Sequence, residues 1–433
     1  FYFGAATSAA QVEGCAQRSC AGKGPSIWDD FTKVKGRVVG NADAAVADDS
    51  YHKMQADLDM IEHTGLTAYR FSISWPRIFP EGKGGVNQAG VDYYNALIDA
   101  LLVRNVQPFV TLYHWDLPSA LEQQYRGWLG REVVDDFVAY ADFCFSTFGD
   151  RVKKWITINE PHTFLTMGYI SGIHAPGRCS NRTRCAHGDS STEAYTAGHN
   201  VILAHATAVD LYRSQYKSKQ NGMIGITLNQ DWGEPYDVVN NTDVAAAERR
   251  NIFQMAWFAD PIFRGQYPQV MVDRLGARLP RFTDNEKTFV NGSTDFLGLN
   301  HYSSNYIQSC VASWGDIGCN TDEGTLSVTR NASGRALGPQ AASAWLHVAP
   351  WGFYNTIMWN KYRYNNPLIF ITENGSWNDT FRWGMTSSLK KSINSKSCRI
   401  NYYNGYLNEM VRAIKNGANI QGYFAWSLVD NFE

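Results

Sequence analysis

The sequence predicts an α/β fold, a single (β/α)8 TIM barrel with its active site at the C-terminal ends of the strands. Three observations carry this prediction. Short β-type runs alternate with longer helical runs, no linker or tandem repeat interrupts them, and the β-type runs end in polar or aromatic side chains. A chain of 433 residues could form two or three average domains. The uninterrupted alternation instead favours one catalytic domain over residues 1–433.

Eight runs rich in β-branched and aromatic residues are the expected strands. They are nearly continuous apolar stretches, as is typical of parallel strands that are buried on both faces. In chain order the runs are 2–9, 68–75, 107–114, 154–160, 223–229, 295–300, 367–374 and 421–427.

Amphipathic helices are expected between the strands. In 132–149 the apolar residues recur with the 3.6-residue period of a helix, and Gly149 can end it. These residues are Val134, Phe137, Val138, Ala141, Cys144, Phe145 and Phe148. The stretch 406–417 repeats the pattern before Gly417, with Leu407, Met410, Val411 and Ile414 as its apolar residues.

Polar and aromatic side chains stand where the expected strands end. In parallel barrels these ends open on one face, which is where such folds hold their active sites. We therefore expect one polar site built from several strands. The residues are Gln11, Arg70, His114, Asn159, Glu160, Asn229, Asn300, Tyr302, Glu373, Asn374 and Trp426.

Two of these residues are carboxylates, Glu160 in the stretch TINEP and Glu373 in TENG. Either one alone fits a solvated loop equally well, but a pair at a barrel mouth suits cleavage of a glycosidic bond. No G-x-S-x-G elbow, H-E-x-x-H motif or Walker loop occurs. The chain thus lacks the residues for acyl transfer, zinc hydrolysis and phosphoryl transfer. We predict no metal and no cofactor.

Composition narrows the class of partner. The formal net charge of −2 argues against nucleic acid. No apolar stretch approaches the roughly 18 residues that cross a bilayer. Aromatic residues make up 14% of the chain, which indicates a large core or a site where indoles stack on sugar rings.

The eight cysteines include three pairs that are close in sequence. Cys15 with Cys20, Cys179 with Cys185, and Cys310 with Cys319 can each close a small loop, as in an oxidising compartment. None has the double C-x-x-C spacing of a zinc site. Cys144 lies on a helical apolar face and is expected to be a buried thiol, whereas Cys398 has no assignment.

Glycosylation triplets add weak support for secretion. They begin at Asn181, Asn240, Asn291, Asn331, Asn374 and Asn378. Together with the cysteine pairs they favour a secreted or lumenal glycoprotein, in the vacuole, the lysosome or outside the cell.

The sequence resembles glycoside hydrolase family 1, the β-glucosidase family, and in particular its eukaryotic secreted-type members. The matching stretches lie in the family's order and spacing over essentially the whole length. They are FGAATSAAQVEG, GKGPSIWD, DSYHKMQADLDMI, YRFSISWPRIFP, TLYHWDLPSAL, TINEP, WGFY, ITENG and GYFAWSLVDNFE. The resemblance implies a retaining β-glycosidase that hydrolyses β-glucosides through a covalent glycosyl-enzyme. Small-molecule or oligosaccharide β-glycosides are the implied substrates, and β-galactosides and β-fucosides are further candidates.

The resemblance also implies roles for single residues. Glu373 would be the nucleophile and Glu160 the acid and base, with the carboxyls about 5–5.5 Å apart. Arg70 and Tyr302 would hold Glu373 ionised and oriented. Many eukaryotic members close the loop at Cys179 and Cys185 with a disulfide. The hydroxyls of the sugar would be bound by Gln11, His114, Asn159, Asn300, Trp426 and Glu433.

Three positions depart from relatives in the family. Plant thioglucosidases carry Gln where Glu160 stands, so ordinary O-glycosides are favoured here. Ala10 replaces a common Tyr or Trp beside Gln11. The sequence stops at Glu433, where family members continue with a Trp and a last barrel helix, so the eighth helix is expected to be missing.

Two alternatives share these residues. A transglycosidase would pass the sugar to an alcohol instead of water. An inactive carbohydrate-binding relative would have lost one or both glutamates, and both are present. The aglycone or acceptor would contact the loops 176–192 and 303–345, and the sequence leaves the choice among glucose, galactose, fucose and mannose open.

Overall fold

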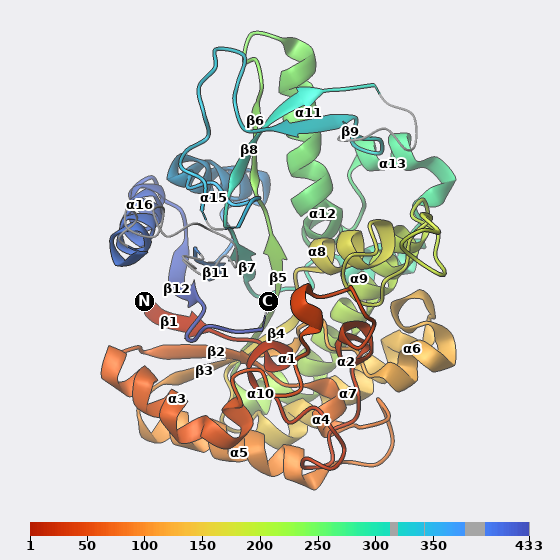
Figure 1. The fold of residues 1–433 in the computed structure, drawn as a ribbon, viewed down its shortest axis with the longest axis vertical. Coiled ribbons are helices and arrows are strands. Elements are labelled where there is room, and N and C mark those ends of the chain that lie inside the picture. Colours follow the sequence, from red (N-terminus) through yellow and green to blue (C-terminus); the bar gives the residue numbers. More distant parts are fainter. Residues whose placement is uncertain (312–318, 342, 377–394, 433) are drawn as a thin grey trace.

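Eight parallel strands form a closed barrel, which confirms the predicted fold (Figure 1). The computed structural model describes residues 1–311, 319–341, 343–376 and 395–432. The first strand pairs with both the second and the last, and this closes the ring. The barrel strands are β1 (Tyr2–Ala6), β2 (Ala68–Ser72), β3 (Gln107–Tyr113), β4 (Lys154–Asn159), β5 (Met223–Asn229), β7 (Leu297–Asn300), β11 (Ile369–Asn374) and β12 (Ile420–Trp426).

Helices connect successive strands around the outside of the barrel (Figure 1). The main ones are α3 (Ser50–Thr64), α5 (Gln88–Val103), α7 (Glu132–Phe148), α9 (Glu193–Leu211), α12 (Trp257–Arg264), α15 (Pro350–Arg363) and α16 (Ser395–Lys415). The other α-helices are α1 (Ala9–Val12), α2 (Ile27–Thr32), α4 (Trp75–Ile78), α6 (Ser119–Tyr125), α8 (Pro161–Leu165), α10 (Lys217–Gln220), α11 (Asn241–Asn251), α13 (Gln269–Leu275) and α14 (Asp284–Val290). Within the described residues, no helix has both the length and the apolar composition needed to cross a membrane.

The two predicted amphipathic helices differ in outcome. All predicted apolar residues of α7 are buried except Val138, which is half-buried, and Gly149 follows the last helical residue. The stretch 406–417 belongs to a longer helix, α16, and there the predicted apolar face was wrong at Val411, which is 43% exposed. The buried stripe instead runs through Tyr402, Tyr406, Met410 and Ala413. Neighbouring residues point about 100° apart on a helix, so a stripe through Met410 turns Val411 outward.

A second, smaller sheet lies beyond the ends of β5 and β7 and was not predicted. Its strands are β6 (Trp232–Pro235), β8 (Ser304–Ser309), β10 (Thr325–Val328) and β9 (Cys319–Asn320), in that order. Figure 1 shows it at the top of the molecule, beside α11. Because β6 and β8 directly follow barrel strands, this sheet stands at the carboxyl-end face of the barrel.

A layer of phenylalanine rings fills the inside of the barrel. Phe109 contacts Phe370 and Phe424 edge-on, with ring centroids 5.3 and 4.7 Å away. Phe296 packs against Phe370 at 5.0 Å. Gly4 makes room for this layer, since a Cβ there would lie 2.6 Å from the Phe424 ring. Two residues further along β2, β3 and β11 the buried side chains are polar, and these residues, Arg70, Thr111 and Thr372, begin the site.

Two of the three predicted cysteine pairs are disulfides in the structure, Cys15–Cys20 and Cys179–Cys185. Cys144 is a free and fully buried thiol, as predicted. Cys310 is disulfide-bonded. The side chains of Cys319, its predicted partner, and of Cys398 lie outside the described residues, so that pairing stays a prediction.

Candidate active site

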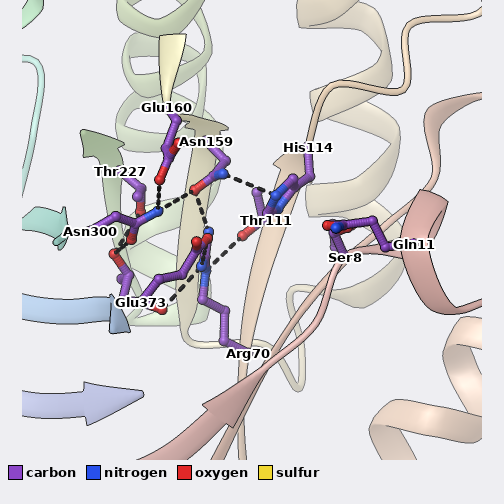
Figure 2. Close-up of polar contacts among 12 residues, drawn as sticks. Ser8, Gln11, Arg70, Thr111, His114, Asn159, Glu160, Thr227, Asn300 and Glu373 are labelled. Atoms are coloured by element: carbon purple, nitrogen blue, oxygen red, sulfur yellow. Dashed lines mark hydrogen bonds and ion pairs between the residues drawn. The ribbon is translucent and has the colours of Figure 1, made fainter. Parts of the chain in front are cut away.

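Arg70 is the centre of the polar layer above the phenylalanine rings. Its side chain is fully buried, in the middle of β2. The guanidinium donates to Glu373 Oε1 at 2.6 Å, to Asn159 Oδ1 at 2.7 Å and to the Thr372 carbonyl at 3.1 Å (Figure 2). Thr111 Oγ1 accepts a fourth bond at 3.3 Å. One arginine in β2 therefore bonds to β3, β4 and β11.

Glu373 is 3% exposed and points into the barrel beside Arg70. Tyr302 donates its hydroxyl hydrogen to Glu373 Oε2 at 2.6 Å. Both carboxylate oxygens are thus fixed by charged or polar donors. A simple strand alternation would turn Glu373 outward, because Thr372 already faces inward. The register of β11 against β7 shifts between Ile371 and Glu373, and this bulge turns the carboxylate inward.

Glu160 directly follows β4 and faces the same layer from above (Figure 2). Its backbone φ is +48°, a left-handed conformation that is costly outside glycine and common at functional sites. Asn300 Nδ2 donates to Glu160 Oε1 at 2.7 Å. Burial, and then the nearby charge of Glu373, raise the pKa of Glu160 to about 8. Two carboxyls close enough to interact therefore sit in different environments.

His114 lies next to this pair at the end of β3. Its Nε2 accepts from Asn159 Nδ2 at 3.0 Å, which assigns the ring hydrogen to Nδ1. Burial, and then the charge of Arg70, hold the pKa of His114 well below its usual value, so the ring is neutral. Its ring stacks on Trp426 with centroids 5.6 Å apart. His114 Nδ1 has no hydrogen-bond partner among the described residues.

Gln11 occupies the opposite side of the close-up in Figure 2 from Glu160. It belongs to α1, the short helix after β1. Its amide oxygen accepts from the Ser8 hydroxyl, and its Nε2 donates to Asn431 Oδ1 at 3.1 Å. The segment after β12 thus holds Gln11 at the barrel mouth.

Most of the predicted site residues meet here. The connected set is Arg70, His114, Asn159, Glu160, Asn300, Tyr302, Glu373 and Trp426, with Gln11 at the edge. Asn374 does not belong to this set. Its amide nitrogen donates to the His301 carbonyl and the Tyr402 hydroxyl, and its amide oxygen accepts from the Tyr423 hydroxyl. Glu433 lies outside the described residues, so its predicted contact with the sugar stays a prediction.

Sequence reasoning missed several residues that orient the carboxyls. Thr372 donates to Asn300 Oδ1 at 2.6 Å and so turns the Asn300 amide toward Glu160. Trp115, with a φ of +74°, donates its indole N–H to the Asn159 carbonyl at 2.8 Å. Their positions in the sequence could have indicated them, because Thr372 directly precedes Glu373 and Trp115 directly follows His114.

Metal-ligating side chains do not cluster at this site in the described part of the chain. The one group of three such residues found there is Cys15, Cys20 and His52, outside the carboxylate pair. The raised pKa of Glu160, beside a Glu373 carboxylate held by Arg70 and Tyr302, suits proton transfer by the first and nucleophilic attack by the second.

Comparisons with known proteins show the family of the chain. The model of glycosyl hydrolase family 1 matches residues 1–433. The chain is 47% identical to β-glucosidase 34 of Oryza sativa subsp. japonica, an alignment that covers all of this chain and 84% of that protein. It is 46% identical to β-glucosidase 40 of Arabidopsis thaliana, with 100% and 84% covered.

Solved structures superpose closely. A rice β-glucosidase mutant in a covalent complex with Glc has a TM-score of 0.94 at 46% identity, covering all of this chain and 90% of the other. A β-glucosidase from the fungus Humicola insolens in complex with glucose has a TM-score of 0.93 at 40% identity, with the same coverage.

Proposed function

The chain belongs to glycosyl hydrolase family 1 and is a retaining β-glucosidase, and on this premise we propose that Glu373 is its nucleophile and Glu160 its acid and base. One observation carries the assignment. Two buried carboxyls share one polar layer, yet Glu373 receives bonds from Arg70 and Tyr302 whereas Glu160 receives one from the neutral Asn300. The donors around Glu373 suit a carboxylate that acts as the nucleophile, and the environment of Glu160 suits a carboxylic acid that donates a proton.

In the first step Glu373 attacks the anomeric carbon and forms a covalent glucosyl ester. Glu160 gives its proton to the glycosidic oxygen, so the aglycone leaves as a neutral alcohol. A pKa of about 8 supports this role, because Glu160 then carries the proton at neutral pH. Arg70 and Tyr302 orient Glu373 for attack, since each holds one of its two oxygens.

In the second step Glu160 takes a proton from water while the water oxygen attacks the anomeric carbon. The ester bond breaks, and Glu373 returns as a carboxylate with glucose as the product. The ester carries no charge, so the negative charge of Glu373, which raises the pKa of Glu160 in the free enzyme, is absent in the intermediate. Glu160 is then better suited to act as a base.

The sugar is held by the groups around the pair. The His114 ring stacks on Trp426 and so holds Nδ1–H at a fixed place, which suits it to donate to a sugar hydroxyl. Asn159 donates only one of its two amide hydrogens to His114, so the other can serve a second hydroxyl. Gln11 and Asn300 complete this set, and Glu433 belongs to it by the family resemblance alone.

A 2-fluoro β-glucoside with a good leaving group tests the nucleophile. The fluorine slows both steps, but the leaving group keeps the first one fast, so the ester accumulates. We expect peptide mapping to find the added sugar on Glu373, and Glu373→Ala to lose activity by several orders of magnitude with its fold retained. Label on another residue, or a folded Glu373→Ala variant with a tenth of normal activity, would contradict the assignment.

We also infer that the described ranges form one catalytic domain and that the protein is a secreted or lumenal glycoprotein. The single closed barrel supports the first inference. The disulfides Cys15–Cys20 and Cys179–Cys185 support the second. Asn181, Asn240 and Asn291 are exposed and suited to carry glycans, whereas Asn374 is buried behind the catalytic layer.

A further inference from the structure

A second cluster of reactive side chains lies where the loop after α1 meets the start of α3. Cys15 and Cys20 form a disulfide there, and the ring of His52 faces it. Two sulfur atoms and one ring nitrogen all lie within 4.8 Å of one another. Cys20 Sγ is 3.8 Å from His52 Nε2. The proposed glucosidase chemistry uses none of these residues.

Asp49 fixes the orientation and the tautomer of His52. The His52 Nδ1 and Asp49 Oδ1 atoms are 2.6 Å apart, so the ring donates its Nδ1 hydrogen to the carboxylate. The lone pair of Nε2 therefore faces Cys20. A carboxylate that holds the far nitrogen of a histidine is the usual outer support of a histidine that binds zinc.

One distance already matches a tetrahedral metal site, and the two sulfur atoms would separate once their bond is reduced. Zinc binds thiolate sulfur at about 2.3 Å and imidazole nitrogen at about 2.0–2.1 Å, so ligands at tetrahedral angles are separated by about 3.6 Å for S···N and about 3.8 Å for S···S. The observed 3.8 Å from Cys20 Sγ to His52 Nε2 is already close to the first value. Four residues separate Cys15 from Cys20, which is within the spacing of zinc-binding cysteine pairs.

We propose that reduction of the Cys15–Cys20 disulfide creates a zinc site formed by Cys15, Cys20 and His52. Two equivalents of a small thiol supply the electrons: the protein disulfide becomes two cysteine thiols and the reductant becomes its disulfide. Zinc then replaces both thiol protons. Two thiolates, one neutral imidazole and Zn²⁺ carry no net charge, and water takes the fourth position.

Solvent exposure makes the Cys15–Cys20 disulfide easier to reduce than the Cys179–Cys185 disulfide. Cys15 is 6% exposed, but Cys20 is half-buried and the His52 side chain is 56% exposed, so a small thiol can attack at Cys20 and a metal ion can reach His52. Cys179 and Cys185 are 1% and 0% exposed. In the described residues they have no third metal-ligating side chain within the same range. The inference goes beyond the proposed glycosidase activity and does not depend on it.

Zinc titration of the full-length protein before and after thiol reduction tests the proposal. Reductant is removed without oxygen, alkylation mapping identifies the opened disulfide, and a chromophoric chelator competes for the metal. We expect no zinc in the oxidised protein and one zinc per chain after Cys15–Cys20 opens. Cobalt in place of zinc should give thiolate-to-metal charge-transfer absorption and the visible bands of tetrahedral cobalt.

Three variants make the result specific. C15S/C20S keeps every other cysteine and should lose the site. His52→Ala should weaken binding at least tenfold. Asp49→Asn, which suits the left-handed backbone at that position, should weaken it about 10–100-fold by freeing the His52 ring. A disulfide that resists reduction, a reduced protein without zinc, equal binding by C15S/C20S, or unchanged affinity in His52→Ala would each overturn the proposal.

Discussion

The protonation of Glu160 predicts the basic limb of the pH profile. Burial and the charge of Glu373 raise its pKa to about 8, so the acid form required for the first step is present below that pH and is lost above it. We expect kcat/KM for a β-glucoside with a poor leaving group to fall as pH rises through about 8, since kcat/KM reports the free enzyme. A basic limb near the ordinary pKa of a glutamate, between 4 and 5, would contradict this.

Asn300 should tune this limb. Its amide donates to Glu160 and favours the ionised carboxylate, which lowers the pKa of Glu160. In Asn300→Ala that stabilisation is lost, so the basic limb should move to higher pH while kcat/KM decreases. Asn229→Ala is the matched control, because Asn229 ends the neighbouring strand β5 and its side-chain oxygen has no hydrogen-bond partner among the described residues. Equal shifts of the basic limb in both variants would contradict this role of Asn300.

Glu160→Ala should separate the two chemical steps. Good leaving groups need little protonation, so such substrates should still form the glucosyl ester and release a burst of aglycone. Hydrolysis of the ester should stall without a base, and azide, a nucleophile that needs none, should restore turnover as glucosyl azide. Rapid-mix kinetics with good and poor leaving groups measures this. Equal losses for both kinds of substrate, without azide rescue, would argue against Glu160 as the acid and base.

The strands show what the sequence could and could not predict. All eight runs became barrel strands because their apolar residues suit burial on both faces. The sequence could not predict that the side chains of Asn159 and Glu373 point inward, because each direction depends on a bulge in its strand. The register shifts between Ile156 and Asn159 in β4, and between Ile371 and Glu373 in β11. No local residue pattern marks these shifts, because they arise from pairing with neighbouring strands.

The phenylalanine layer should dominate the stability of the barrel. Phe109 is fully buried and contacts three further aromatic rings. Phe109→Ala should lower the free energy of unfolding by about 3–5 kcal/mol, from lost burial and the cavity that remains. Val39→Ala, which shortens a 96% exposed side chain, should change it by less than about 0.5 kcal/mol. Chemical denaturation measures both, and comparable losses would show that the barrel rearranges to fill the space.

The whole chain could be predicted as a barrel more readily than as a complete enzyme. The polar residues at the eight strand ends predicted the face of the barrel on which the site lies. The two glutamates predicted the chemistry that we propose for it. The small sheet of β6, β8, β10 and β9 was missed because its strands have two to six residues and lie within long connections. The pairing of Cys15 with Cys20 followed from sequence, but the approach of His52 came only from the packing of α3 against that loop.

The disulfides make the proposed compartment testable. Cys179 and Cys185 close a loop of about seven residues, and in the chain-entropy model such a bridge stabilises the fold by about 2 kcal/mol. Protein from its native source should therefore yield the linked peptides Cys179–Cys185 and Cys15–Cys20 in non-reducing mass spectrometry, after alkylation of free thiols. Cys144 should react only after unfolding, since it is fully buried. All eight cysteines as free thiols would point to a reducing compartment, because an oxidising one would keep at least the buried Cys179–Cys185 bridge closed.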